Sequence, residues 1–473
     1  MQNKWKILLT VAVTTMMATM DASILNIAFP VLVGVFNTDV TVVMWVTVAF
    51  VLVSTSSMLM IGRIGDIVGR RKIFLAGILI FTLGLLTCAL AGSIGQLIFF
   101  RSLQAIGAAM TVSCGTAIVT EAFPTSEVGK GLGSLGVSVS LGFIAGPIVG
   151  GFLLDFLDWR SIFYFRLPLG AAAFLMAVFF LKRDQVKHEK IHLDFMGTLT
   201  SSAGIFLFVF GVSQMREHGP ASLRVVLLAG LGLALIVFFV LLERRVENPI
   251  VDPALFKNKL FSSAVGGLIL HFIAAPPYML IIPFYLMLGL NLRASEAGML
   301  MAVTSVTTMV FGPISGWLSD KFGPVWFAAF GAAAAAMSFL FMLGFDLQSS
   351  TQAITPVFVL VGIGAGTFQP ANNSIIMSAV QRENLGTASA IIATQRQVGI
   401  AVGMAWTGTL FTLWENGYRQ DFLQQGMDEV CASRAAIPAA FHDVVAVSIF
   451  INVIVVILSL LPLWTKKENP VRQ

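Results

Sequence analysis

Long apolar runs separated by short polar connectors dominate the hydrophobic pattern of this chain. Each run is about 20 residues long, which is the length that an α-helix needs to cross the ~30 Å hydrocarbon core of a bilayer. No segment shows the two-residue period of a barrel strand, so the pattern predicts an all-α integral membrane protein. The fourteen predicted transmembrane helices lie near residues 8–33, 42–62, 73–93, 96–120, 130–154, 160–181, 195–213, 223–242, 260–288, 297–318, 325–345, 353–378, 387–413 and 442–464.

Composition agrees with a bilayer as the solvent. The chain is 57% hydrophobic and 11% charged, whereas ordinary soluble domains carry about 25% charged residues. The first run is too long for a signal-peptide core and has no small-residue cleavage site, so we expect a retained helix. Cys88, Cys114 and Cys431 form neither a metal-ligand spacing nor a disulfide framework, and we expect no metal or cofactor.

The basic residues predict the orientation, because cytoplasmic loops retain Lys and Arg. With the N-terminus inside, all twelve lysines fall in cytoplasmic connectors or tails. We therefore expect both termini to be cytoplasmic, with basic loops at the membrane lipid. The net charge of +5 reflects this topology, since no pattern typical of nucleic-acid binding accompanies it.

An internal repeat divides the chain. "GRIGDIVG" (residues 62–69) and "GWLSDKFG" (residues 316–323) share Gly, Asp and Gly 254 residues apart. We interpret them as equivalent loops of two six-helix bundles, residues 1–190 and 256–473, with an inserted helix pair at residues 191–255. Repeated halves are typical of carriers that alternate access to a site near the bilayer midplane.

Four motifs point to a family. "MDASILNIAFP", "GRIGDIVGRRKIFL", "RSLQAIGAAM" and "LGFIAGPIVGG" occur in this order on successive predicted helices. Together they resemble the fourteen-helix drug:proton antiporter branch of the major facilitator superfamily, and the resemblance covers essentially the whole chain.

The first repeated loop has two interpretations. Its glycines permit a tight turn, and Asp66 can pair with Arg70 or Arg71, or cap the next helix, while the basic cluster anchors the loop at anionic lipid. The resemblance implies more, namely a latch between the halves in the outward-facing state. The predicted latch comprises Gly62, Asp66, Gly69, Arg70 and Arg71, with Asp320 as its weaker counterpart in the second half.

The fifth predicted helix carries Gly142, Gly146 and Gly150 on one face, and Pro147 removes a backbone donor beside them. Ordinary packing of small residues would explain this stripe. The resemblance implies a gating role for Gly146, Pro147 and Gly150 that is found in antiporters rather than importers. We take it to favour export.

Asp21 is a carboxylate deep in the first predicted helix. Arg101 shares a polar stripe with Gln104, and an Arg inside a membrane needs a partner. Asp21 lies roughly 13 Å and Arg101 roughly 7 Å below the outer ends of their helices, a difference that an Arg side chain can span. We predict that Asp21 is the exchangeable proton site, coupled to Arg101; the alternative is a permanent structural pair.

The second half offers fewer polar residues. Arg396 lies about 15 Å from the inner end of its helix and is a candidate to line the cavity. Gln369 and Asn373 fit either a cavity or interhelical hydrogen bonds, and aromatic residues fill helix interfaces more often than cavities. The predicted substrate cavity comprises Asn26, Gln104, Tyr278, Tyr285, Phe368, Gln369, Asn373 and Arg396.

His271 precedes Pro276 and Pro277, where we expect a kink. It either relays protons or, as we favour, donates to a backbone carbonyl that the kink frees. The chain also departs from the family pattern at Arg166, where Asn is usual, and at Met287, where Gln is usual. Three deep arginines against one acid favour neutral, zwitterionic or anionic organic cargo over divalent cations.

Other classes of function lack support. "GLGSLG" (residues 131–136) opens a predicted membrane helix rather than following a strand, so it is no dinucleotide site. The chain has no G-x-x-x-x-G-K-[ST] and no G-x-S-x-G motif, so neither an ATP-driven pump nor an enzyme is expected.

The sequence thus predicts a monomeric proton-coupled antiporter that exports small organic compounds across the plasma (inner) membrane of a prokaryote. The alternatives are a channel or sensor with the carrier fold, a proton-coupled importer, and the inner-membrane component of an efflux complex with an adaptor protein.

Overall fold

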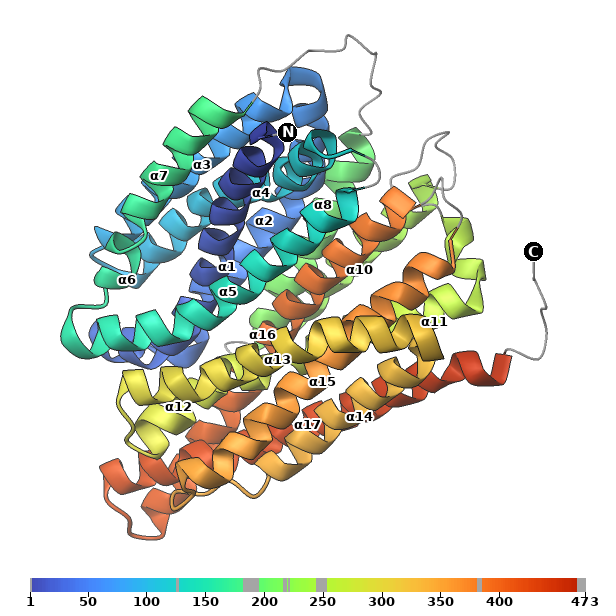
Figure 1. The fold of residues 1–473 in the computed structure, drawn as a ribbon. Coiled ribbons are helices and arrows are strands. Elements are labelled where there is room, and N and C mark those ends of the chain that lie inside the picture. Colours follow the sequence, from blue (N-terminus) through green and yellow to red (C-terminus); the bar gives the residue numbers. More distant parts are fainter. Residues whose placement is uncertain are drawn as a thin grey trace. The chain divides into compact units, whose positions relative to one another are not determined.

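The computed structural model describes residues 2–124, 127–181, 195–215, 219, 222–243, 253–380 and 385–465. Helices and short connectors account for these ranges, and no strand occurs within them (Figure 1). The α-helices are α1 (Gln2–Phe36), α2 (Val40–Val68), α3 (Arg70–Ala89), α4 (Ile94–Ala122), α5 (Val128–Phe156), α6 (Ser161–Tyr164), α7 (Leu167–Phe180), α8 (Phe195–Ser213), α10 (Leu223–Glu243), α11 (Lys259–Ala274), α12 (Ile282–Phe284), α13 (Ala294–Phe322), α14 (Pro324–Met342), α15 (Thr351–Ser378), α16 (Leu385–Gln424) and α17 (Glu429–Thr465). A 3₁₀ turn covers Pro253–Lys257, and π-helical turns cover Pro277–Ile281 and Tyr285–Gly289.

The prediction of an all-α membrane protein is confirmed. Twelve helical segments of the described ranges are long and apolar enough to cross a membrane. The predicted runs at 195–213 and 387–413 are helical too, in α8 and α16, but they are not among the twelve. The described apolar part of α8 is shorter, Leu199–Val212, and α16 carries Arg396 between two glutamines. Fourteen spans therefore stay a prediction.

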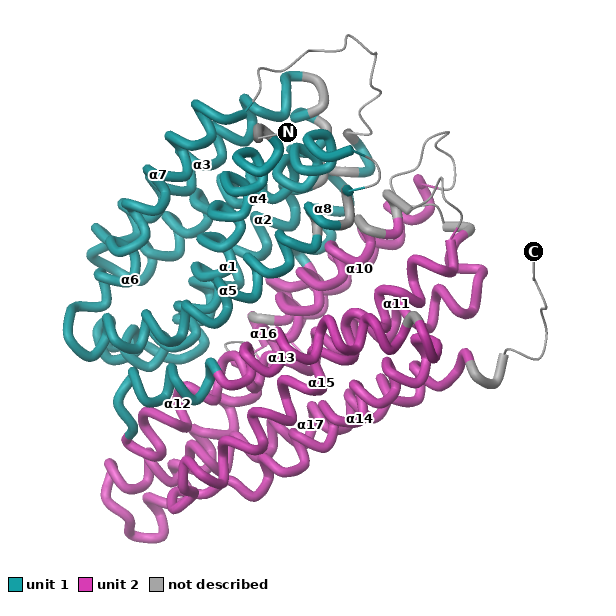
Figure 2. The backbone as a smooth tube through the Cα atoms, viewed as in Figure 1, with its two compact units in different colours: residues 1–207, 292–302 teal, residues 208–291, 303–473 magenta. Residues whose placement is uncertain are grey.

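The chain forms two compact units (Figure 2). The first unit contains Met1–Leu207 and Leu292–Ala302, and the second contains Phe208–Asn291 and Val303–Gln473. Helix α13 therefore starts in the first unit and continues in the second.

In the first unit, α5 packs closely on α1 through its glycine stripe. A Cβ atom at Gly146 would lie 2.9 Å from the Cβ of Ser23, and one at Gly150 would lie 2.5 Å from Cγ1 of Ile24. The hydroxyl of Ser23 donates to the carbonyl of Gly142 over 3.1 Å. The close approach that the glycine spacing predicts is present, and it brings α5 against the helix that carries Asp21.

In the second unit, glycines bring α14 and α15 equally close. A Cβ at Gly331 would lie 2.3 Å from the backbone nitrogen of Phe368, and one at Gly364 would lie 2.8 Å from that of Ala335. Phe368 is fully buried and belongs to the core that this contact creates. Both units are thus built on helices whose backbones touch.

The two repeated loops share a backbone feature. Gly69 immediately before α3 has φ 114°, and Gly323 immediately before α14 has φ 90°. L-residues rarely adopt such angles, so glycine is needed at both turns. The two positions are 254 residues apart, the spacing of the sequence repeat.

Candidate functional site

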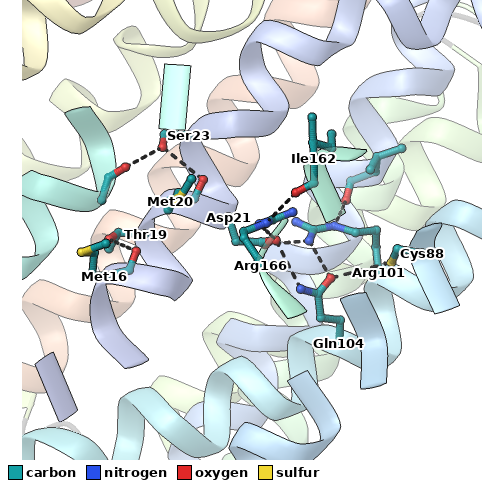
Figure 3. Close-up of polar contacts among 12 residues, drawn as sticks. Met16, Thr19, Met20, Asp21, Ser23, Cys88, Arg101, Gln104, Ile162 and Arg166 are labelled. Carbon is teal, nitrogen blue, oxygen red and sulfur yellow. Dashed lines mark hydrogen bonds and ion pairs between the residues drawn. The ribbon is translucent and has the colours of Figure 1, made fainter. Parts of the chain in front are cut away.

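Asp21 lies near the middle of α1 and is fully buried. One carboxylate oxygen, Oδ2, accepts a hydrogen bond of 2.6 Å from Nη1 of Arg101. The other, Oδ1, accepts from Nη1 of Arg166 and, over 3.3 Å, from Nε2 of Gln104 (Figure 3). Both oxygens of the acid therefore accept hydrogen bonds, from α4 and from the residue that precedes α7.

Arg101 comes from α4 and is 1% exposed. Its Nη1 also donates to Oε1 of Gln104 over 2.7 Å, and its guanidinium carbon lies 4.2 Å from the centre of the Phe50 ring. A cation over an aromatic face gains electrostatic attraction without a second acid. The predicted pairing of Arg101 with Asp21 is present in the structure.

Arg166 is the third charge of the cluster, and the sequence did not predict its contact with Asp21. It directly precedes α7, is fully buried, and donates from Nε to the carbonyl of Ile162 over 2.9 Å. Its Nη2 has no hydrogen-bond partner among the described residues. The sequence signal was the departure from the family's usual Asn, which marked Arg166 as unusual but left its role open.

Gln104 and Cys88 complete the network. Oε1 of Gln104 accepts from Arg101 and also from the thiol of Cys88, 3.7 Å away on α3. Gln104 was predicted to line the substrate cavity, but it is fully buried and bonded to the charged groups. In this structure it holds Arg101 and Asp21 in position. No feature of the sequence connected Cys88 with these charged groups.

The Asp21 cluster, defined as Asp21, Arg101 and Arg166, holds one negative and two positive groups away from solvent. A buried ion pair is weak support for stability by itself, because desolvation opposes the Coulomb attraction, but removing one partner costs about 3–5 kcal/mol. Protonation of Asp21 would remove the negative charge that attracts both guanidinium groups. The arrangement can therefore link protonation to the movement of an arginine.

Arg396 on α16 contrasts with the cluster. Its side chain is exposed, and neither an ion pair nor a hydrogen bond joins it to the described residues. Beside it, Oε1 of Gln395 is buried without a partner in the same ranges. An exposed guanidinium far from the helix ends requires water or a ligand around it.

The three aromatic residues predicted to line the cavity pack within the second unit. Tyr285 is fully buried, stacks on Phe345 with 5.6 Å between ring centres, and donates to the carbonyl of Asp346 over 2.6 Å. Tyr278 donates to the hydroxyl of Thr304 over 2.7 Å. Phe368 lies in the core described above. These positions favour the packing interpretation, because each ring already has protein neighbours.

The predicted polar cavity residues differ in their partners. Asn26 on α1 is 5% exposed, and its Oδ1 has no partner in the described ranges. Oδ1 of Asn373 on α15 is in the same situation, and Gln369 is half-buried on that helix. The interhelical hydrogen bond comes instead from Asn372, whose Nδ2 donates to the carbonyl of Ala264 over 2.9 Å. Asn26 and Asn373 therefore remain candidates to accept a ligand's hydrogen bond.

The backbone carbonyls near the prolines that follow His271 accept hydrogen bonds from other residues than the one we expected. Pro277 cannot bond to the carbonyl of Ile273, which accepts from Nε1 of Trp406 over 2.9 Å. The neighbouring carbonyl of Ala274 accepts from Ser448 over 3.0 Å. His271 itself packs against Phe368, with 4.4 Å between ring centres, and its Nδ1 has no partner among the described residues. The sequence does not show that Trp406, which is far from His271 along the chain, donates to the free carbonyl.

The predicted latch is described only in part. The side chains of Asp66 and Asp320 lie outside the described residues. Nη1 of Arg70 forms an ion pair with Glu121 of α4, and Nη2 of Arg71 donates to the carbonyl of Val178 on α7 over 2.8 Å. These two contacts connect the first turn of α3 to α4 and α7 of its own unit.

Comparison with known proteins identifies the family. The sequence profile of the Major Facilitator Superfamily matches residues 11–404 and, in a second match, residues 263–472. The riboflavin transporter RibZ of Clostridioides difficile (strain 630) is 32% identical over 416 residues, 87% of this chain and 89% of RibZ. The multidrug transporter protein MdtP of Bacillus subtilis (strain 168) is 26% identical over 451 residues, 94% of this chain and 82% of MdtP.

A solved structure supports the same fold. The crystal structure of a bacterial homologue of the human lysosomal transporter Spinster matches with a TM-score of 0.71, covering 97% of this chain and 96% of that one. Its sequence identity is 16%, so this likeness concerns the fold alone. Apolar helices, matched profile and relatives agree: this chain is a multi-pass membrane transporter that belongs to the Major Facilitator Superfamily.

Proposed function

We propose that this transporter is a proton-coupled antiporter that exports small organic compounds by alternating access. In this proposal the chain crosses the plasma (inner) membrane of a prokaryote fourteen times as a monomer, with both termini in the cytoplasm. Two six-helix bundles, residues 1–190 and 256–473, form the carrier, and residues 191–255 form an inserted helix pair.

The observation that carries the proposal is the buried pairing of Asp21 with Arg101. Burying a charged carboxylate in the membrane costs free energy, so such residues usually have a charged partner and a function. Here the partner, Arg101, belongs to another helix. Protonation of Asp21 would weaken its attraction for Arg101 and Arg166. One proton moving through ~150 mV releases ~3.5 kcal/mol, which supports a concentration ratio of a few hundred for a neutral cargo at one-to-one coupling.

The proposed direction of transport, export, rests on the glycine motif of α5. The glycines of that motif pack against α1, and the resemblance to antiporters supports a gating role for Gly146, Pro147 and Gly150. The loop latch formed by Asp66 with Arg70 and Arg71, and its counterpart at Asp320, belongs to the same proposal.

The test is proton-driven uptake into inverted vesicles. Vesicles that contain the transporter should concentrate cargo from a chemically varied panel when their lumen is acidified, and collapse of the proton gradient should stop uptake. Uptake that continues at full rate without a gradient contradicts proton coupling. Accumulation only in right-side-out vesicles, driven by an inward proton gradient, contradicts export and supports the importer alternative.

A second candidate concerns the cargo. RibZ is named a riboflavin transporter, and it aligns with this chain over 89% of its length at 32% identity. We therefore propose riboflavin as the first compound of the panel; it is a mostly neutral organic molecule, which fits the excess of arginine over acid in the membrane. Competition by riboflavin for uptake of another cargo would support this choice, and no competition at saturating riboflavin would exclude it.

A further inference from the structure

Helix α5 carries a second stripe, which faces α13 rather than α1. Pro147, Gly151 and Asp155 follow one another at four-residue intervals and therefore share one face. A Cβ atom at Gly151 would lie 2.4 Å from the carbonyl oxygen of Ala294, and one at Gly298 would lie 2.1 Å from the carbonyl oxygen of Pro147. The backbones of α5 and of the first turns of α13 thus touch, inside the first unit.

The first turn of α13 cannot cap itself. Arg293 occupies the N-cap position, because its carbonyl accepts from the amide of Ala297 over 3.0 Å. An arginine side chain has no acceptor, so it cannot bond the free amides that begin a helix. Glu296 accepts from the amide of Arg293 over 2.9 Å, but this leaves the amides of Ala294 and Ser295.

Asp155 supplies the missing cap from α5. Its Oδ1 accepts from the amide of Ala294 over 2.9 Å, and its Oδ2 accepts from the amide of Ser295 over 3.1 Å. A carboxylate in this position also interacts favourably with the positive end of the α13 dipole. A residue 139 positions earlier in the chain thus does the work that Ser, Thr, Asp or Asn usually does within the helix.

We propose that Asp155 is a releasable cap that holds the start of α13 against α5 and sets how often the transporter occupies the state described here. Only Ala294 to Ala302 of α13 belong to the first unit, and the rest of the helix belongs to the second. If α13 tilts as one rigid helix during a change of access, its first turn moves off Asp155 and these two bonds break. Asp155 is half-buried and Arg293 is exposed, so water can take over the freed amides.

This inference goes beyond the proposed function, since it needs neither proton coupling nor a direction of transport. The experiment uses the full chain in nanodiscs, where a reagent reaches both membrane faces, without cargo or gradient. The reporter is the thiol of S295C in a C431S background, because Ser295 is buried here and Cys431 is exposed. Its rate of alkylation by a polar maleimide measures how often the cap opens.

Asp155→Ala should raise the alkylation rate about tenfold, the effect expected when a charged cap is lost. Asp158→Ala is the matched control: Asp158 lies two residues beyond the end of α5, is exposed, and pairs with Arg160 instead of α13. It should change the rate less than twofold. An unchanged rate in Asp155→Ala overturns the proposal. If that variant does not give a monodisperse protein, Asp155→Asn, which keeps one acceptor, should give an intermediate rate, and a wild-type rate there also overturns the proposal.

A second variant separates capping from general packing. Arg293→Ser gives α13 a cap of its own, so it should also raise the rate, and adding Asp155→Ala to it should change the rate less than twofold. Glu296→Gln is the control, because it weakens the Arg293–Glu296 ion pair but leaves the acceptors of Asp155 in place. A full tenfold effect of Asp155→Ala in the Arg293→Ser background would mean that Asp155 does not act by capping α13.

Discussion

In the first unit two arginines lie fully buried against Asp21, whereas in the second unit Arg396 is exposed and has no ion pair within the described ranges. The first arrangement uses protein groups to satisfy protein charges. The second leaves a positive charge about 17 Å along α16 from its start, at a depth where lipid would be a costly neighbour. In our proposal the first unit carries the charge that couples transport to protons, and the second unit presents a charge to water or cargo.

The largest effect is expected from Asp21→Asn. The change keeps size and hydrogen bonding but cannot titrate, and it leaves two buried guanidinium groups without an acid. Proton-driven uptake into inverted vesicles should disappear, while exchange of cargo down its own gradient should survive. The melting temperature should also fall, since breaking a buried pair costs about 3–5 kcal/mol.

The double variant Asp21→Asn with Arg101→Gln tests the structural alternative. It returns the cluster to the net charge of the wild type, so stability should recover in part. Recovery of transport with stability would mean that Asp21 serves only as a partner of Arg101. Full proton-coupled transport by Asp21→Asn alone would contradict the role that we assign to this acid.

A smaller effect is expected from Arg166→Gln. This variant makes the cluster neutral and keeps the bond between Asp21 and Arg101, so the free energy of unfolding should fall by about 1.5–3 kcal/mol, the value of one hydrogen bond to a charged group. Chemical denaturation of Arg166→Gln beside Asp21→Asn measures the difference. An equal loss in both variants would make Arg166 the main partner of the acid.

Arg396→Ala should scarcely change stability, within about 0.5 kcal/mol, because the side chain is exposed and unpaired within the described residues. Its effect should instead depend on cargo charge. Loss of a positive group that faces the cargo should weaken anionic or neutral cargo more than cationic cargo in competition assays. Equal weakening of all cargo would assign Arg396 a structural role and remove the contrast between the units.

The smallest effect is expected along α8 and α10, which we propose as a peripheral spacer. Only 11% of the most apolar stretch of α10 is buried. Helix α8 contacts α2 through a hydrogen bond of 2.9 Å from the hydroxyl of Ser202 to the carbonyl of Ser56. Single cysteines along both helices should react with maleimide at the same rate with and without cargo. Strong protection by cargo, above all next to Ser202, would place this pair in the pathway.

The sequence predicts local features of this protein well and distant partnerships unevenly. Helical runs follow from apolar length, and the pairing of Asp21 with Arg101 follows from helix depth. The contact of Arg166 with Asp21 was not predicted. Arg166 lies just before α7, so its position along a helix does not show that its side chain points at α1. We predicted that Tyr285 lines the cavity, but it packs against Phe345 in the second unit. A sequence does not distinguish an aromatic residue of a core from one of a cavity.

Asp155 was missed for a related reason. Capping rules look for an acceptor within a few residues of the helix start, and the acceptor for α13 belongs to α5. The available signal was Arg293 at the N-cap position, because its side chain cannot accept hydrogen bonds from the first amides of α13. These amides therefore need an acceptor from elsewhere in the chain.

The glycine contact between α5 and α1 has a mechanical consequence. With only the small Ser23 side chain between the two backbones at this point, α1 and α5 should tilt together as one stiff beam. Asp155 lies nine residues beyond Gly146, about 14 Å along that beam. A tilt too small to disturb the packing around Asp21 would become a larger displacement at Asp155. There the two hydrogen bonds of 2.9 and 3.1 Å to α13 would weaken steeply as their lengths and angles change.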